Sequence, residues 1–184
     1  MAESASGKSR LISAAGQLFV RASYSTVTVA QILEASALRP PTLYHHFEDK
    51  ENLYVTWAVR AMRETGDRIR GCSNMCEIAN SLANEPLVDL LQVRLDCAAL
   101  DRKTSRQSIE RSYQVDIVEP LTAAMRQNGV PESRLPESVQ KFASCISFAL
   151  PKYTSMPGAL TKAVAVEFAL SLAGPGVERP EAIA

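Results

Sequence analysis

Hydrophobic residues recur along this chain with the period of an α-helix. Val29, Ile32 and Leu33 fall at positions i, i+3 and i+4, and similar stripes follow downstream. No run of residues alternates between polar and apolar as a half-buried strand would. The pattern predicts an all-α protein, with two short helices within residues 28–50 and longer ones over about 50–70, 74–84, 86–102, 105–128, 136–150 and 158–173.

Prolines shape two of these helices. Pro86 is expected to begin the helix over 86–102, because the first-turn amides of a helix have no intrahelical acceptor. Pro120 is expected to kink the helix over 105–128, because proline breaks the backbone hydrogen-bond ladder. The apolar side of the first of these helices should comprise Leu87, Leu90, Leu91, Leu95 and Ala98.

Residues 28–50 contain the clearest local pattern, two helices separated by a tight turn. Thr28 and Gln31 stand three apart before an apolar run, which predicts a capping box at the first helix. Pro40 and Pro41 suit the first turn of the second helix. This is the arrangement of a helix-turn-helix, whose second helix enters the major groove of DNA.

The residue types on the second helix fit that use. Leu43 and Phe47, four apart, are expected to anchor it to the core. The remaining surface then carries hydroxyl, aromatic and imidazole groups, from Thr42, Tyr44, His45 and His46. Adjacent histidines also suggest a metal site, but neighbouring residues on a helix diverge, so we expect no metal here.

A longer series of positions carries a family resemblance. The series is Leu11 to Phe19, Tyr24, Thr28, Val29, Ile32, then Thr42-Leu43-Tyr44-His45-His46-Phe47, Lys50 and Leu53. Over about residues 10–55 it resembles the signature of the TetR/AcrR family of bacterial transcriptional repressors. Several anchored positions in order are more specific than a lone short motif.

The chain departs from that family pattern at three places. Ser23 and Ala37 stand where the family usually has glycine, and both changes leave the expected fold intact. Arg39-Pro40-Pro41 stands where the family often has Ser-x-Gly. The two prolines remove two amide donors that could otherwise bind phosphate, so DNA contacts at this helix start are expected to differ from the family's.

The resemblance implies a homodimeric repressor that binds a palindromic DNA operator and is released by an unknown small-molecule effector. It implies a three-helix DNA-binding domain over residues 1–53 and a ligand-binding and dimerisation domain over 54–184. Residues 1–7 belong to a start that lacks an apolar core, and we expect them to form a disordered arm. The family's dimer interface lies on its last two helices, here about 136–150 and 158–173. The last of these is apolar around much of its girth, which favours a dimer interface over the alternative of an internal core helix.

The expected DNA contacts are Thr28, Arg39, Thr42, Tyr44, His45 and Lys50. Arg39 is the candidate for reading a guanine through two hydrogen bonds; a phosphate contact or a salt bridge is the alternative. Tyr44 would lie against a phosphate or a thymine methyl, or else pack on the fold. Lys50 would contact a phosphate, the alternative being a solvated lysine.

The effector pocket is expected among the middle helices and the helix at 136–150. Its candidate lining is Trp57, Arg94, Cys97, Tyr113, Asp116, Phe142, Cys145 and Phe148. Arg94 and Asp116 each interrupt a partly apolar face, and a buried charge there would need a partner, either the other residue or a ligand. The alternative is that both are solvated or paired with each other.

Composition narrows the function further. The 184 residues carry no formal net charge, which argues against a non-specific nucleic-acid coat protein. Residues 1–47 hold four basic and two acidic residues, so four minus two gives this N-terminal segment a formal charge of +2. We expect no membrane span and no secretory signal, and hence a cytoplasmic protein.

The cysteines and histidines do not suggest catalysis. Cys72, Cys76, Cys97 and Cys145 are most simply reduced and buried, although the spacing of the first two leaves a metal or redox sensor as an alternative. Both histidines lie in the DNA-facing helix, and there is no phosphate-binding glycine loop. We therefore expect no enzyme and no cofactor. The alternative function is a helical interaction protein or co-regulator that acts through protein partners.

Overall fold

The computed structural model describes residues 6–84, 88–147, 166 and 171. This part of the chain is helical and contains no strand, which confirms the all-α prediction. Its first helices are α1 (Gly7–Phe19), α2 (Val29–Ser36), α3 (Pro40–His46) and α4 (Lys50–Gly71). The others are α5 (Met75–Asn84), α6 (Leu90–Asp96), α7 (Lys103–Ser112), α8 (Glu119–Gln127) and α9 (Leu135–Ser147).

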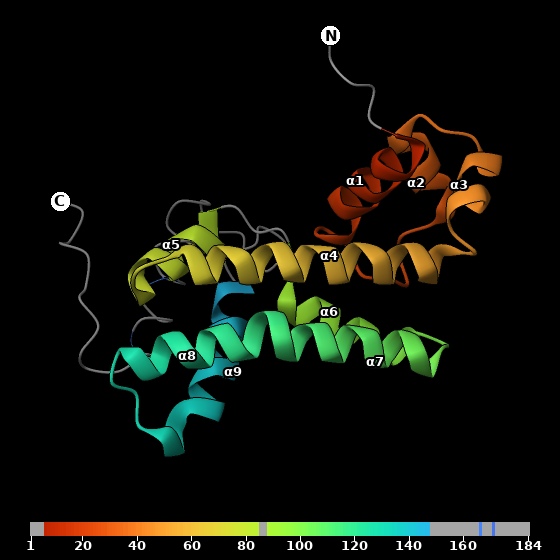
Figure 1. The fold of residues 1–184 in the computed structure, drawn as a ribbon. Coiled ribbons are helices and arrows are strands. Elements are labelled where there is room, and N and C mark those ends of the chain that lie inside the picture. Colours follow the sequence, from red (N-terminus) through yellow and green to blue (C-terminus); the bar gives the residue numbers. More distant parts are fainter. Residues whose placement is uncertain (1–5, 85–87, 148–165, 167–170, 172–184) are drawn as a thin grey trace, which may run out of the picture.

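Helices α1, α2 and α3 pack together over the first turns of α4, and we call this unit the head (Figure 1). Leu11, Ile32 and Leu43 are fully buried in it, one from each of the three short helices. Burial of such side chains is the main source of stability in a small domain. The second helix of the predicted helix-turn-helix is thereby fixed to a core.

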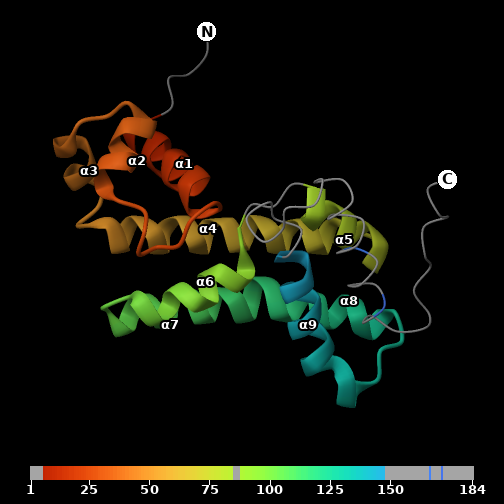
Figure 2. The same ribbon diagram turned by 180° about the vertical axis from the view of Figure 1, so that it is seen from behind.

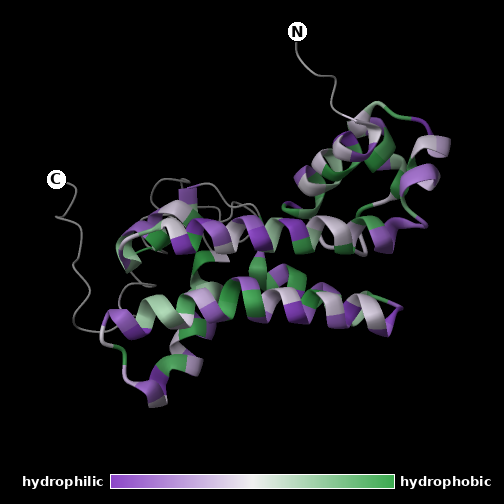
Figure 3. Ribbon diagram, viewed as in Figure 1, coloured by the Kyte–Doolittle hydropathy of each residue, from purple (hydrophilic) through white to green (hydrophobic). Residues whose placement is uncertain are grey.

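The remaining helices form the body, and α4 runs from the head into it. Helices α7 and α8 make one long rod that lies alongside α4, and α9 packs against α8, α6 and α5 (Figures 1 and 2). Hydrophobic residues of the body gather where α4, α6 and this rod face one another (Figure 3). The domain boundary expected at residue 53 therefore falls inside a continuous helix.

The helix expected over 86–102 is shorter than predicted. It begins at Leu90, after Asp89, whose carboxylate accepts a hydrogen bond from the Gln92 amide at 3.0 Å. A 3₁₀ turn, Cys97–Ala99, ends it. Its buried face also differs, because Leu95 is 60% exposed and Asp96 only 4%. The prediction that Leu95 lies on the apolar side is wrong.

The rod of α7 and α8 contains a π-helical turn, Tyr113–Val118, just before Pro120. There the Glu119 amide donates to the Gln114 carbonyl, five residues back. In place of the kink expected at Pro120 the structure has this widened turn, and Figure 1 shows the rod continuing through it. The turn lies very close to α4, since a Cβ on Gly66 would come within 2.2 Å of the Asp116 carbonyl oxygen.

The apolar stripe of the helix predicted at 136–150 lies in the core of this subunit. In α9, Val139, Phe142, Ala143 and Ile146 are all buried. For this stripe the structure therefore shows packing within the chain. Most of the helix predicted over 158–173 lies outside the described residues, as do residues 148–150 and residues 1–5 of the expected arm.

Candidate nucleic-acid interface

The capping box predicted at the start of α2 is confirmed. The Thr28 hydroxyl oxygen accepts a hydrogen bond from the Gln31 amide at 3.2 Å. In return, the Gln31 Oε1 accepts one from the Thr28 amide at 2.8 Å. Each bond gives an acceptor to an amide that the helix itself cannot satisfy, so the first turn of the supporting helix is well fixed.

The turn between α2 and α3 uses a backbone conformation that favours glycine. Ala37 has φ 52° and ψ 40°, and it is the one non-glycine residue with positive φ in the described part of the chain. This left-handed conformation is strained, because it brings the Ala37 Cβ close to the following carbonyl oxygen. Arg10 of α1 donates to the Ser36 carbonyl oxygen at 2.7 Å, which supports the end of α2. The turn forms as expected, despite the absence of glycine.

Helix α3 begins at Pro40, as the proline pair predicts. Arg39 precedes it with an extended backbone, φ −95° and ψ 156°, which is the conformation that a following proline imposes. Leu43 is fully buried and Phe47 is 3% exposed, so these two residues anchor the helix as expected. The side chain of Tyr44, by contrast, is 60% exposed.

The residues of α3 differ in how far they are open to a partner. Arg39, Tyr44 and His45 are exposed. Thr42 and His46 are half-buried against the N-terminus of α1, where a Cβ on Gly7 would lie 3.0 Å from the Thr42 methyl and 3.4 Å from the His46 Nε2. The open face of the helix therefore centres on the first three.

Lys50, expected to contact a phosphate, is turned toward the protein. Its ammonium donates to the carbonyl oxygens of Tyr24 at 2.9 Å and Val27 at 3.0 Å. It also lies 4.1 Å from the centroid of the Tyr24 ring. Burial lowers the pKa of Lys50 from its usual value, and the Asp96 carboxylate opposes that effect. The sequence pattern could not show this, because a long side chain can turn either way.

Asp96 joins the body to the head through a buried carboxylate. Its Oδ2 accepts hydrogen bonds from the Tyr24 amide at 2.9 Å and the Tyr54 hydroxyl at 3.0 Å. Its Oδ1 accepts one from the Gln92 side-chain amide at 2.8 Å. These donors offset the cost of burying a charge. They come from the α1–α2 loop, from α4 and from α6, so three segments meet at one side chain.

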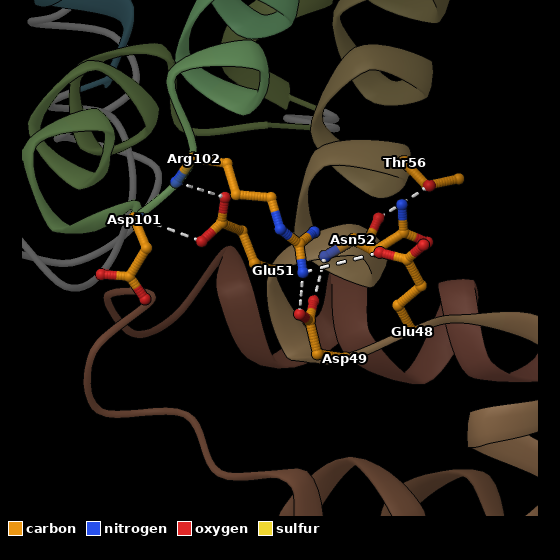
Figure 4. Close-up of polar contacts among 7 residues, drawn as sticks. All are labelled: Glu48, Asp49, Glu51, Asn52, Thr56, Asp101 and Arg102. Atoms are coloured by element: carbon orange, nitrogen blue, oxygen red, sulfur yellow. Dashed lines mark hydrogen bonds and ion pairs between the residues drawn. The ribbon is translucent and has the colours of Figure 1, made fainter.

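A second buried carboxylate, that of Glu51 at the start of α4, joins the head to the segment before α7 (Figure 4). It accepts hydrogen bonds from the Asp101 amide at 2.9 Å and the Arg102 amide at 3.1 Å. Burial alone would raise the pKa of Glu51, but these bonds and one from Ser105 outweigh it and lower the pKa below its usual value.

The Arg102 side chain adds an outer contact to the same junction. Its guanidinium pairs with Asp49 and lies 3.6 Å from the Glu48 carboxylate (Figure 4). Asp49 also caps α4, since its Oδ1 accepts a hydrogen bond from the Asn52 amide at 2.8 Å. The starts of α4 and α7 are thus tied together on both a buried and an exposed side.

This geometry agrees with comparisons to known proteins. Residues 11–55 match the family model of bacterial regulatory proteins of the tetR family. The matched residues run from α1 to the start of α4, so the head is similar to the N-terminal domain of that family. TetR-family regulators are transcription factors and not enzymes. No curated protein matches the sequence.

Solved structures extend the likeness to the whole TetR-type fold. A TetR-family transcriptional regulator from Streptomyces coelicolor is 21% identical, with 90% of this chain and 79% of that chain covered and a TM-score of 0.61. The reduced form of E. coli NemR is 15% identical, with 89% and 97% covered and a TM-score of 0.63. The fatty acid degradation regulator FadR from Bacillus halodurans is 15% identical, with 94% and 97% covered and a TM-score of 0.64. At these identities the likeness shows the fold.

The residues expected to line an effector pocket lie on several helices of this TetR-type fold. Trp57 lies between α1 and α4, with its ring 5.3 Å from that of Phe19. In the body, Tyr113, Phe142 and Cys145 are buried and Cys97 is half-buried, whereas Phe148 lies outside the described residues. Trp57 therefore packs against α1 of the head.

Arg94 and Asp116 have separate partners. Arg94 is exposed, and its guanidinium lies 5.3 Å from the centroid of the Tyr113 ring. Asp116 accepts a hydrogen bond from the Ser112 hydroxyl at 2.7 Å and lies 3.8 Å from the Arg70 guanidinium. The two side chains therefore do not pair with each other, and the exposure of Arg94 agrees with the alternative of a solvated residue.

The described residues offer little support for a metal or redox site. No group of three His, Cys, Asp or Glu side chains among them could hold a metal ion. Cys72 and Cys76 are half-buried free thiols, and burial raises the pKa of Cys72, which disfavours the reactive thiolate. None of the described helices is long and apolar enough to cross a membrane.

Sequence reasoning missed the two carboxylates that join head and body. A signal for Asp96 was present, since Leu90, Val93 and Asp96 follow one another at intervals of three and are all buried in α6. An aspartate in register with such a stripe can be interpreted as a buried group that needs partners. Glu51 gave no comparable signal, because its partners are backbone amides fifty residues away.

Proposed function

We propose that this chain is a homodimeric, sequence-specific DNA-binding repressor that a small molecule releases from its operator. The observation that supports this most is the exposure of Arg39, Tyr44 and His45 on a short helix anchored by Leu43 and Phe47. A rigid helix with polar side chains on its open face suits direct readout of base edges in the major groove.

The proposed contacts have distinct roles. Arg39, at the start of α3, would read a guanine, and His45 would meet base edges in the groove. Tyr44 would lie against a phosphate or a thymine methyl. Thr28 and Thr42 would contact DNA through their hydroxyls. For Lys50, a phosphate contact would require its ammonium to leave the two carbonyl oxygens that it now binds.

Dimerisation gives these contacts their spacing. Two recognition helices must lie about 34–36 Å apart, or a multiple of that, to enter successive major grooves of an inverted repeat. We propose pairing through the helices at about 136–150 and 158–173. On α9 the face left open for a partner holds Gln140 and Lys141, which are exposed.

Release by an effector follows from the same geometry. A small molecule that binds better to a body with another spacing of the two heads shifts the population away from the DNA-binding form. We propose that it binds in the body, near Arg94, Cys97, Tyr113, Asp116, Phe142, Cys145 and Phe148. Binding of chromosomal DNA would place the protein in the cytoplasm.

Selection from a randomised duplex library tests the proposal. The purified protein is incubated with the library at low salt, and the bound pool is sequenced. An enriched inverted repeat is the expected result, and its two half-sites give the operator. A folded protein that enriches no sequence would overturn the proposal in favour of a co-regulator that acts through protein partners.

A further inference from the structure

Both polar atoms of the Tyr24 backbone are held by side chains from other parts of the chain. Tyr24 lies in the loop between α1 and α2. Its amide donates to Asp96 of the body at 2.9 Å, and its carbonyl oxygen accepts from Lys50 of α4 at 2.9 Å. A loop amide without such an acceptor would turn to water. The Tyr24 backbone is therefore held by a hydrogen bond to the body on one side and by a hydrogen bond from α4 on the other.

The Tyr24 ring belongs to the same assembly. It lies 5.0 Å from the ring of Tyr54 in an edge-on arrangement, and the Lys50 ammonium is 4.1 Å from its centroid. The Tyr54 hydroxyl donates to the same Asp96 oxygen that accepts from the Tyr24 amide. Burial, followed by the charge of Glu51, raises the pKa of Tyr24 to about 12, so its hydroxyl stays neutral at physiological pH.

The position of this assembly links the body to the DNA-reading helices. Asp96 is the last residue of α6, and Thr28, which caps α2, follows Tyr24 by only four residues. The second carbonyl that Lys50 binds, that of Val27, directly precedes this cap. A shift of α6 would therefore move the loop that begins the helix-turn-helix.

We propose that Asp96 and Lys50 are positioning residues for DNA binding, which act through Tyr24 to fix the head relative to the body. The inference rests on the proposed function, because a fixed head matters only if two heads must match two half-sites. It also gives Lys50 a role other than phosphate contact. Its ammonium holds two loop carbonyls and so orients α2 and α3.

Operator spacing tests this role. Wild type is compared on the selected repeat and on versions with one base pair inserted or deleted between the half-sites, a change of about 3.4 Å and a tenth of a turn. Wild type should lose about tenfold or more in affinity for the altered spacings. Asp96→Ala and Lys50→Met should each reduce that loss to about threefold or less, because a loosened head can adapt.

Matched variants separate positioning from general damage. Leu95→Ala removes an exposed neighbour on the same helix and should keep the wild-type spacing preference. Asp96→Asn retains an acceptor for the Tyr24 amide and should keep most of the wild-type spacing preference. The double variant Asp96→Ala/Lys50→Met should lose no more spacing preference than the stronger single variant, because both changes release the same loop. Wild-type spacing preference in both single variants would overturn the proposal.

A measurement without DNA keeps the inference separate from the proposed function. Hydrogen exchange of the Tyr24 amide in the wild-type protein should be slowed at least about tenfold relative to the exposed loop around Ser25, because Asp96 holds that amide. Equal exchange at the two sites would show that Asp96 does not hold the Tyr24 amide, and would overturn the proposal whether or not a DNA sequence is ever selected. If the amide is protected and no repeat is enriched, the proposed function fails alone.

Discussion

Helix α3 belongs to the head, whereas the assembly around Tyr24 joins the head to the body, and the polar groups of these two regions are arranged in opposite ways. Arg39, just before α3, and His45, on α3, are exposed to solvent. Around Tyr24, the buried Asp96 carboxylate accepts three hydrogen bonds and the Lys50 ammonium donates two. A surface that binds a partner keeps its hydrogen-bonding groups open, whereas a junction that sets geometry satisfies them within the chain.

This contrast predicts which property each change should affect. Removal of an exposed group on α3 should alter DNA binding and leave stability almost unchanged. Removal of a buried carboxylate at the junction leaves amides without acceptors, so stability should fall first.

Glu51→Ala should destabilise the protein by about 2–4 kcal/mol, because the Asp101 and Arg102 amides would lose their acceptor. Urea unfolding measures the loss as a lower midpoint. Glu48→Ala is the control, since the Glu48 side chain is 79% exposed and its removal should change stability by less than about 0.5 kcal/mol. Equal effects of the two changes would contradict the assignment of Glu51 as a buried connector.

Arg39→Ala should reduce discrimination at one base pair of each half-site by about 1–3 kcal/mol, with no change in the unfolding midpoint. Binding to a panel of single-base operator variants measures this. Arg21→Ala removes another exposed arginine of the head, near the end of α1, and should leave the base preference intact. A uniform loss across all sequences would instead identify Arg39 as a phosphate contact.

Acid should weaken the junction through Glu51. Its pKa is lower in the folded protein than in the unfolded chain, because hydrogen bonds to the charged form outweigh burial. The resulting stability is fully present above the unfolded value and is lost as the pH falls through the folded value. Glu51→Gln should therefore flatten the fall in stability below about pH 4.5. Unfolding midpoints measured between neutral and acid pH check this, and identical slopes would contradict it.

Ala37→Gly should stabilise the head slightly. The left-handed conformation of Ala37 costs about 1–2 kcal/mol, which glycine would avoid. The extra freedom of glycine in the unfolded chain lowers the free energy of unfolding by about 0.5–1 kcal/mol. A net gain of about 0.5 kcal/mol should appear as a small rise in the melting temperature, with unchanged DNA affinity. Ala35→Gly, in a helical position of α2, should lower the melting temperature instead.

Features that depend on near neighbours in the sequence could be predicted. The capping box of Thr28 and Gln31 and the helix start at Pro40 each involve residues within a few positions, and the structure has both. The anchoring of α3 by Leu43 and Phe47 follows from helical spacing alone. Exposure of the opposite face is its direct consequence.

Features that depend on contacts between distant segments could not be predicted from the sequence. The bond between Tyr24 and Asp96 spans 72 residues. The sequence also placed Leu95 on the buried side of its helix, because which face of α6 is buried depends on helices distant in the sequence, such as α9. A shift of one residue moves the buried face by about 100°. Such a shift exchanges a leucine for the carboxylate that joins head to body.

The most direct test of the central claim, that the open face of α3 reads DNA, is the affinity of the purified protein for the selected inverted repeat. It is compared with the affinity for a scrambled duplex of the same length, over a range of salt concentrations. We expect at least about a 1,000-fold preference for the repeat, and a steep fall in both affinities as salt rises. Equal affinity for the two duplexes would contradict it.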